Sequence, residues 1–246
     1  MSPSPIVLIT GASGGIGRAL AQQLRLRDWR IAAVGRDADT LAPLQADARI
    51  VADLTEPGEA QEAINACTEL IGAPSHLAHM MGSTLAAPFH KTVFLQWEEA
   101  LRVNLISAIA MLQAWIRSRR EVNLPGAAVL ASSVVAQIGV ANHEVIAAAK
   151  GGIDALVRSA ASSYAAQGLR INAVSPGMTD TPMTASMLRL EAQRESAGRQ
   201  YPLGGIQMPK DIAAVAAWLL SDEASRITGQ IIPVDGGFTA IRPLVR

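Results

Sequence analysis

Short apolar runs alternate with longer amphipathic stretches along the whole chain. The apolar runs, which we interpret as strands, lie at residues 6–10, 30–35, 48–52, 76–82, 127–133, 169–176 and 230–236. Between them, apolar positions recur with helical spacing; over 15–27, Ile16, Leu20 and Leu24 form one stripe. Strands that alternate with helices of this length predict an α/β fold of Rossmann type, in which a doubly wound, seven-stranded parallel sheet lies between two helical layers.

The domain organisation follows from length and from the lack of internal boundaries. The 246 residues fit one large α/β domain, and no linker, repeat or low-complexity tract divides them, so we expect one domain over 1–246. The least regular stretch is 178–208, which is rich in Met, Ser, Gln and Gly. A long irregular insertion late in such a fold predicts a substrate lid.

Composition excludes several classes of protein. Twenty-one acidic residues balance 21 basic ones, which argues against nucleic acid or an anionic membrane as a partner. Cys67 is the single cysteine, so no internal disulfide can form, and a reducing compartment fits. The chain starts without a basic region and contains no apolar stretch of membrane-spanning length. We therefore expect a cytoplasmic protein, and we expect no metal site.

A glycine-rich turn follows the first predicted strand. The sequence ITGASGGIGRAL (9–20) predicts a strand, a tight turn and a helix. Glycines there let the backbone approach a pyrophosphate, and the start of the helix offers free N–H groups and a positive dipole end. An ordinary strand-to-helix turn is the alternative, but the flanking elements and the N-terminal location favour a dinucleotide site. The turn residues expected at the cofactor are Gly11, Ser13, Gly15, Ile16 and Gly17.

The spacing T-G-x-x-x-G-x-G resembles that of the short-chain dehydrogenase/reductase family. Further matches follow in order: Asp53-Leu54 resembles the adenine-contacting pair, Asn104 the helix asparagine, and Ser133 the active-site serine. The resemblance also covers SPGMTDT (175–181) and the C-terminal stretch that begins PKDIAAVAAWLL, so it extends over nearly the whole chain.

In the family, the Pro-Gly turn of that SPGMTDT stretch holds the nicotinamide carboxamide. The resemblance assigns this role to Pro176 and Gly177, together with the Thr179 backbone and Thr181. It implies a pyridine nucleotide as cofactor and an alcohol or carbonyl as substrate.

Two motifs depart from the family pattern. The family signature Tyr-x-x-x-Lys lies thirteen residues after the serine, and here those positions hold Ile146 and Lys150. The strand motif Asn-Asn-Ala-Gly reads His79-Met80-Met81-Gly82, of which Met81 and Gly82 are still expected at the cofactor. A tyrosine beside an ammonium exchanges a proton with the substrate oxygen near neutral pH. Isoleucine cannot do so.

Three side chains are candidates for a replacement proton donor. Tyr164 lies fourteen residues beyond Lys150, or about 21 Å along a helix, and cannot reach. Tyr201, at the end of the irregular segment, could swing inward. His143 precedes Lys150 by seven residues and can share its helix face, with Asn142 as the helix N-cap. We favour His143 as an additional catalytic residue; the alternative is a surface histidine in the loop that enters the helix.

Lys150 favours cofactor binding, and the end of the second strand indicates which cofactor is bound. Lys150 stands amid small apolar residues, and the resemblance implies that it hydrogen-bonds the nicotinamide ribose; a flexible ammonium with three donors fits the hydroxyls of a ribose. The second strand ends Gly35-Arg36-Asp37, and glycine followed by arginine favours NADP, although NAD is possible. Asp37 is expected to cap the next helix.

We therefore expect an NAD(P)(H)-dependent oxidoreductase that uses Asn104, Ser133, Lys150 and His143. The alternatives are a cofactor-binding protein without redox turnover, and a non-redox isomerase or lyase. The substrate is expected to be apolar or bulky, given Ile146 and the methionines of the lid. Two long predicted helices, near 92–118 and 143–166, carry more apolar surface than one sheet face needs, which predicts a homodimer or homotetramer of the kind that the family forms.

Overall fold

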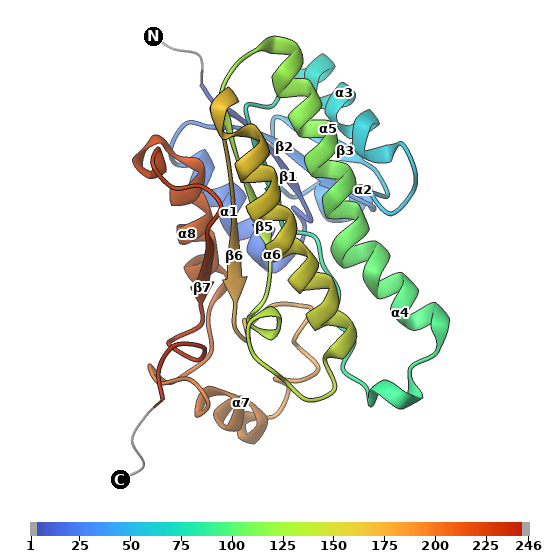
Figure 1. Ribbon diagram of the computed structural model, residues 1–246, viewed down its shortest axis with the longest axis vertical. Helices are drawn as coiled ribbons and strands as arrows, with labels where there is room; N and C mark the ends of the chain where they lie inside the picture. The colour runs from blue at the N-terminus through green and yellow to red at the C-terminus, as the bar shows by residue number, and fades with distance from the viewer. Residues whose placement is uncertain (1–3, 243–246) are drawn as a thin grey trace.

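Seven parallel strands form one twisted sheet in the order β3-β2-β1-β4-β5-β6-β7 (Figure 1). The computed structural model describes residues 4–242, so the two ends of the predicted domain lie outside the described residues. The strands are β1 Ile6–Thr10, β2 Arg30–Gly35, β3 Ala48–Val51, β4 His76–His79, β5 Gly126–Ala131, β6 Leu169–Pro176 and β7 Ile231–Val234. The predicted fold class is confirmed, and all seven strands lie where the apolar runs placed them.

Several predicted runs extend past the carboxyl ends of the observed strands, and the run at β4 does so most. The apolar run 76–82 forms β4 only as far as His79. Met80 still donates its N–H to the carbonyl of Thr10 at 3.1 Å, after which the chain leaves the sheet. The apolar run therefore continues into a loop, because Met81 and the residues after it line a cavity and do not pair with a neighbouring strand.

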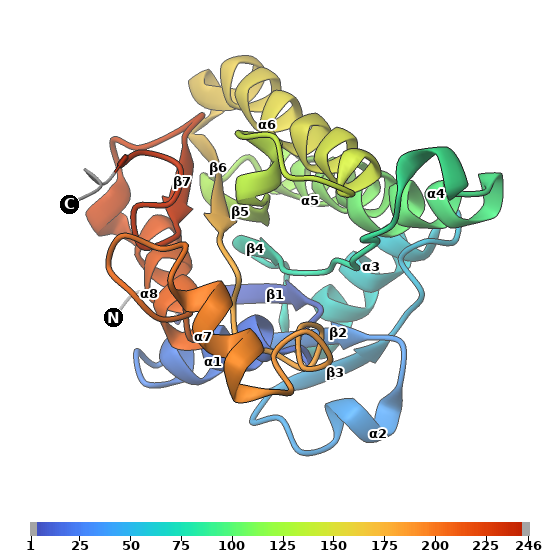
Figure 2. The same ribbon diagram turned by 90° about the horizontal axis from the view of Figure 1, so that it is seen from below.

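Helices cover both faces of the sheet (Figure 2). The helices are α1 Gly15–Arg25, α2 Ala38–Leu41, α3 Glu59–Ile71, α4 Phe94–Leu101, α5 Ser107–Val122, α6 Glu144–Tyr164, α7 Glu191–Gly198 and α8 Pro209–Leu220. Helices α3, α5 and α6 cover one face, and α1 and α8 cover the other. Within residues 4–242, no helix is both long and apolar enough to cross a membrane.

Each face has its own apolar core. Leu20 and Leu24, which the helical spacing predicted as a buried stripe, are fully buried against α8 residues such as Ile212. On the opposite face, Trp115 of α5 and Ile153 of α6 are also fully buried. Burial of this kind stabilises by roughly 1.5–3 kcal/mol per large side chain, so the two cores fix the helices that carry the functional residues.

The long helix predicted over 92–118 is interrupted. Between α4 and α5, residues Arg102–Ile106 form a π-helical turn that contains Asn104. The Asn104 side chain donates to the carbonyl of Ala100 at 2.9 Å, four residues earlier, and so occupies an acceptor that regular helix would use. Widened turns of this type often occur at functional sites.

The start of α6 also differs from the expectation. Asn142 was predicted as its N-cap, but His143 holds that position and makes no side-chain cap bond. Asn142 adopts a left-handed conformation with φ of 62°, which asparagine tolerates better than most residues. The helix therefore begins at Glu144, one residue later than an Asn142 cap would place it.

His79 links three elements below the carboxyl edge of the sheet. Its Nδ1 lies 2.9 Å from the Thr10 hydroxyl of β1, and its Nε2 lies 3.3 Å from the Ser107 hydroxyl of α5. The Ser107 proton goes to the carbonyl of Val103 at 2.7 Å, so Nε2 is the donor to Ser107 and Nδ1 accepts from Thr10. Burial, reinforced by the charge of Lys150, lowers the pKa of His79 to about 3. The histidine of the altered strand motif is thus a neutral structural bridge.

This bridge predicts an acid sensitivity. Because the folded pKa of His79 is about 3, below the ordinary 6.5, its stabilisation is complete above pH 6.5 and is lost as the pH falls towards 3. His79→Asn removes the titrating ring and keeps an amide oxygen that can accept from the Thr10 hydroxyl. Between about pH 6 and pH 4, we expect the free energy of unfolding of the variant to fall less steeply, by up to roughly 1.4 kcal/mol per pH unit.

Urea denaturation across that pH range measures the two slopes. His76, whose pKa burial also lowers to about 3, is present in both proteins and supplies a shared background. Parallel curves for the parent and the variant would contradict the assignment.

Candidate active site

A cavity of about 320 Å³ opens at the carboxyl ends of the central strands. Its walls come from the turn after β1, the loops after β4 and β5, the start of α6 and the segment after β6. In a doubly wound sheet, neighbouring connections leave in opposite directions between β1 and β4, and a crevice for a ligand forms there. The predicted residues that line it are Gly15, Ile16, Gly17, Met81, Gly82, Asn104, Ser133, His143, Lys150, Pro176, Gly177, Thr179 and Thr181.

The glycine turn has the shape of a phosphate cradle. Gly11 has φ of +64°, and a Cβ there would lie 2.9 Å from the Met80 carbonyl group. A Cβ at Gly17 would collide with the carbonyl oxygen of Gly11. Helix α1 begins at Gly15 behind an N-cap, Gly14, that provides no side-chain cap, so its first N–H groups have no partner within the helix. Gly15, Ile16 and Gly17 line the cavity. These residues fit the pyrophosphate of a dinucleotide.

Lys150 reaches the floor of the cavity from α6. Its Nζ donates to the carbonyl of Ala131 at 2.7 Å, and the residue is only 6% exposed. Burial lowers the pKa of Lys150 to about 8, while the charge of Asp154 acts in the opposite direction. A Cβ at Gly82 would lie 3.5 Å from Lys150 Nζ and 3.1 Å from Asn104 Oδ1, so Gly82 brings bare backbone against both groups.

Asn104 holds the loop after β4. Its Oδ1 accepts from the Ser83 N–H at 3.1 Å, and its Nδ2 donates to the Ser83 hydroxyl at 2.9 Å. Asn104 is 1% exposed and lines the cavity beside Lys150. The π-helical turn therefore fixes both the asparagine and the loop that forms one cavity wall.

Ser133, His143 and Ile146 line the same cavity. Ser133 begins the short 3-10 turn Val134–Ala136, and its hydroxyl accepts from the Val135 N–H at 3.4 Å. His143 Nδ1 lies 2.8 Å from the carbonyl of Ala141. Because a carbonyl only accepts, Nδ1 carries a proton, and in the neutral form of the ring Nε2 then has the lone pair. Ile146, four residues before Lys150, is buried.

The two tyrosines are placed differently. Tyr201 lines the cavity, but its hydroxyl accepts from the Met178 N–H at 2.7 Å and its ring lies 5.1 Å from that of Phe238. Burial raises the pKa of Tyr201, which makes the phenol a weaker acid. Tyr164 ends α6 and does not line the cavity. Of the three side chains weighed, His143 has a ring nitrogen free of the hydrogen bonds described.

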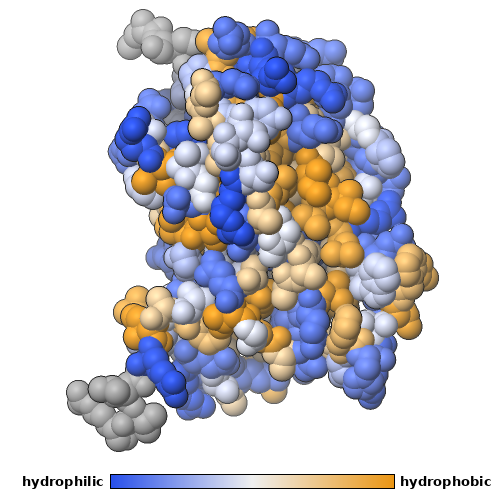
Figure 3. Space-filling model, viewed as in Figure 1, coloured by the Kyte–Doolittle hydropathy of each residue, from blue (hydrophilic) through white to orange (hydrophobic). Residues whose placement is uncertain are grey.

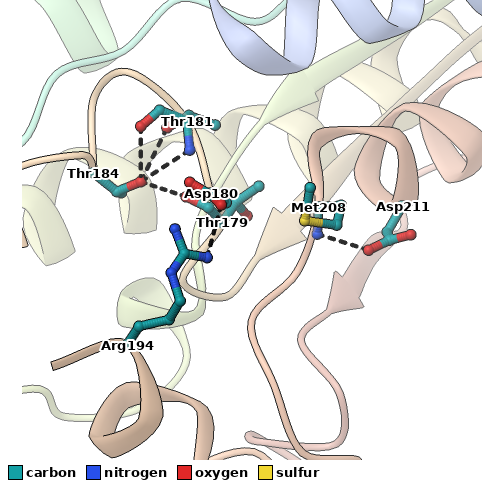
Figure 4. A network of polar contacts seen from close by, with 7 residues as sticks. All are labelled: Thr179, Asp180, Thr181, Thr184, Arg194, Met208 and Asp211. Atoms are coloured by element: carbon teal, nitrogen blue, oxygen red, sulfur yellow. Dashed lines mark hydrogen bonds and ion pairs between the residues drawn. The ribbon is translucent and has the colours of Figure 1, made fainter. Parts of the chain in front are cut away.

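The segment predicted as a lid, 178–208, is more ordered than its composition indicated. It contains α7, and Arg194 of that helix pairs with Asp180 at 2.7 Å (Figure 4). The Thr184 hydroxyl binds the carbonyl of Thr179 and accepts from the Thr181 N–H at 3.1 Å. The side chain of Thr181 packs on the glycine turn, since a Cβ at Gly15 would lie 2.8 Å from Thr181 Cγ2. The segment thus packs against the glycine turn and forms part of the cavity wall.

Five predicted cofactor residues lie outside the cavity lining: Gly11, Ser13, Arg36, Asp53 and Leu54. Gly11 and Ser13 form the body of the turn. Arg36 is exposed at the end of β2, and Asp37 caps α2 by accepting from the Asp39 N–H at 2.8 Å, as the sequence predicted.

Asp53 and Leu54 follow β3 at the same edge of the sheet. Asp53 Oδ1 accepts from the Thr55 hydroxyl at 2.7 Å and from its N–H at 3.1 Å, and Leu54 is buried. These bonds to Thr55, with the charges of Arg36 and Arg102, lower the pKa of Asp53. Arg36, Asp53 and Leu54 thus all follow strands at the carboxyl edge of the sheet, where the cavity opens.

The sequence reasoning missed a buried pair beside Lys150. Ser132 donates its hydroxyl to Asp154 Oδ1 at 2.5 Å, and both residues are buried. Helical spacing could have found Asp154, because it lies four residues after Lys150. Phe238 also lines the cavity, but it comes from a distant part of the chain and no local pattern indicates it.

Known proteins resemble this chain over nearly its full length. A family model described as enoyl-(acyl carrier protein) reductase matches residues 11–239. Cis-4-hydroxycyclohexanecarboxylate dehydrogenase of Sinomonas cyclohexanicum is 33% identical over 244 residues, which cover 96% of this chain and 97% of that protein. 3beta-Hydroxysteroid dehydrogenase 1 of Eggerthella lenta is 30% identical over 242 residues, covering 95% of this chain and 93% of the relative.

A solved structure agrees with these sequence matches. Ligand-free aldohexose dehydrogenase of Thermoplasma acidophilum superposes with a TM-score of 0.92 at 27% identity, covering 99% of this chain and 97% of the other. The match thus includes the sheet, both helical layers and the segments around the cavity. The chain belongs to the short-chain dehydrogenase/reductase family.

Proposed function

We propose that this protein is an NAD(P)(H)-dependent oxidoreductase that interconverts an alcohol and a carbonyl compound. The observation that carries the proposal is the convergence of the glycine turn, Ser133 and Lys150 on one cavity. When bound, the nicotinamide cofactor supplies or accepts the hydride. Relatives named as dehydrogenases of hydroxyl compounds support the same reaction class.

The residues around the cavity then have separate roles. The Ser133 hydroxyl donates to the substrate oxygen and polarises it. Lys150, Pro176, Gly177, Thr179 and Thr181 hold the nicotinamide end of the cofactor. Asn104 keeps the loop after β4 in place through Ser83.

His143 is proposed as the group that exchanges the proton. With Nδ1 donating to Ala141, the Nε2 lone pair accepts the hydroxyl proton when an alcohol is oxidised, directly or through a water. In the reverse direction, the protonated ring donates to the developing alkoxide. Ile146 forms an apolar wall beside this path.

Removal of His143 tests this role. One well-placed acid or base contributes about 10²–10⁴-fold in rate, so we expect His143→Ala to lower kcat by that factor. Cofactor affinity should stay nearly unchanged, because the imidazole does not hold the cofactor. Steady-state kinetics and fluorescence titration measure the two quantities, with Ser133→Ala as the reference for lost turnover.

The complementary variant, Ile146→Tyr, places a phenol four residues before Lys150 and should raise reductase activity on simple carbonyl compounds.

Full activity of His143→Ala on a substrate that requires Ser133 would show that the histidine takes no part in the reaction. Tight cofactor binding without turnover on any carbonyl or alcohol would favour the binding-only alternative, and turnover without cofactor redox change would favour an isomerase or lyase.

NADP is proposed as the preferred cofactor. Gly35 ends β2 where an acid would hold the hydroxyls of NAD, and the exposed Arg36 follows it at the edge expected for the adenosine ribose. A charged hydrogen bond to phosphate contributes roughly 1.5–3 kcal/mol. Arg36→Ala should therefore weaken NADP binding by about tenfold or more and leave NAD binding nearly unchanged. Calorimetric titration of both cofactors checks this, and NAD binding at least tenfold tighter than NADP in the parent would overturn it.

An apolar substrate fits the cavity wall. Val140, Ile146 and Phe238 line it, together with five methionines from two segments: Met80 and Met81 after β4, and Met178, Met183 and Met187 of 178–208. Two relatives are named for alcohols carried on alicyclic rings. We propose an alicyclic or similarly bulky secondary alcohol, or the corresponding ketone, as the substrate class.

We also propose that the chain assembles as a homodimer or homotetramer. Apolar side chains gather over α5 and α6 (Figure 3), and Ile106 and Ile109 are 51% and 44% exposed. Phe94 and Leu95 of α4 are also exposed. We expect a light-scattering mass of two or four times 25.8 kDa, and Ile109→Arg should lower it. A parent mass near one chain would remove this proposal.

A further inference from the structure

Helix α6 turns one stripe of residues towards the end of β5. Ile146, Lys150 and Asp154 follow one another at intervals of four residues and therefore share a face. Lys150 binds the carbonyl of Ala131 at 2.7 Å, and Asp154 accepts from the Ser132 hydroxyl at 2.5 Å. The helix thus holds two successive residues of the chain immediately before Ser133.

We propose that Asp154 is a positioning residue that keeps Lys150 in its ammonium form and fixes the strand end that presents Ser133. This deepens the proposed function, because it rests on the roles given there to Lys150 and Ser133. Asp154 does not line the cavity, so it acts through Lys150 and Ser132 and not on the substrate.

The burial of both groups is the first argument. Lys150 is 6% exposed and Asp154 is 7% exposed, and a charge so far from water is costly unless an opposite charge lies nearby. Desolvation favours neutral Lys150, and the Asp154 carboxylate opposes it. The position one turn before Lys150 is Ile146, which offers no charge or hydrogen bond. On this helix face, the negative charge that stabilises the Lys150 ammonium is therefore that of Asp154, one turn after it.

The other charged groups around the pair act consistently with this role. Desolvation raises the pKa of Asp154, and the Ser132 hydroxyl, Arg158 on the next turn of α6 and Lys150 all act to lower it. From β4, the neutral His79 faces Lys150 without a charge of its own, because its pKa is about 3. Ser132 thus serves two purposes: it supports the carboxylate, and it ties the segment before Ser133 to α6.

The charge of Lys150 can be read directly, without cofactor or substrate. The chain has only three lysines, Lys91, Lys150 and Lys210, and the other two are exposed. In protein labelled with ¹³C-lysine, the Cε resonance of each amine titrates separately, and Lys150→Arg assigns the buried one. We expect the Lys150 midpoint near pH 8 in the parent. Asp154→Asn should move it to lower pH by roughly 1 unit, while the two exposed lysines stay unchanged.

Matched variants separate the two connections. Ser132→Ala keeps the carboxylate and should move the Lys150 midpoint less than Asp154→Asn does, while it lowers turnover by loosening the segment before Ser133. Asp154→Glu keeps the charge and should hold the midpoint close to that of the parent. If Asp154→Asn unfolds the protein, Asp154→Ser supplies the same loss of charge in a smaller side chain.

A Lys150 midpoint that is the same in the parent and in a folded charge-removing variant overturns the proposal. Because the titration needs no activity, this failure is distinct from a failure of the proposed oxidoreductase function, which would appear as absent turnover with the Lys150 shift intact. In an active enzyme, the pH profile of kcat/KM for the cofactor should move with the Lys150 midpoint, because Lys150 is proposed to hold the cofactor. A merely structural role would lower the rate without moving the profile.

Discussion

The parallel direction of all seven strands is the constraint on which the site depends. Parallel strands bring their carboxyl ends to one edge of the sheet, so strand direction alone brings together segments that are far apart in sequence. The glycine turn after β1, Gly82 after β4, Ser133 after β5 and Pro176 at the end of β6 all reach the cavity in this way. The two apolar cores hold the sheet and helices together, so the residues at this edge are not needed for packing the core.

The parts that could be predicted from sequence are those that a local pattern encodes. Buried parallel strands need continuous apolar runs, and the glycine turn needs residues without a Cβ, so both are visible in the linear sequence. The interrupted helix at Asn104 and the left-handed Asn142 could not be read in this way. Each arises where a polar side chain or a loop competes with regular helix, and that competition is settled by tertiary contacts such as the one between Asn104 and Ser83.

Function was harder to predict than fold for a related physical reason. The strand end His79-Met80 looked like part of the same departure as Ile146, yet His79 points into a buried bridge between Thr10 and Ser107. Sequence order cannot tell which side of the sheet edge a side chain takes. Asp154 shows the converse: its spacing from Lys150 was visible, but its partner Ser132 belongs to another element.

The cavity combines a rigid polar edge with an adaptable apolar wall. Lys150, Asn104 and the segment before Ser133 are each tied to backbone or to buried partners, and well-fixed donors are what a reacting oxygen requires. The facing wall consists largely of methionines, three of which lie in the segment that packs against the glycine turn. Methionine fills irregular space and tolerates changes of shape. For the proposed oxidoreductase, the sheet edge sets the chemistry, whereas the methionine wall sets the range of substrates, so a change in one need not alter the other.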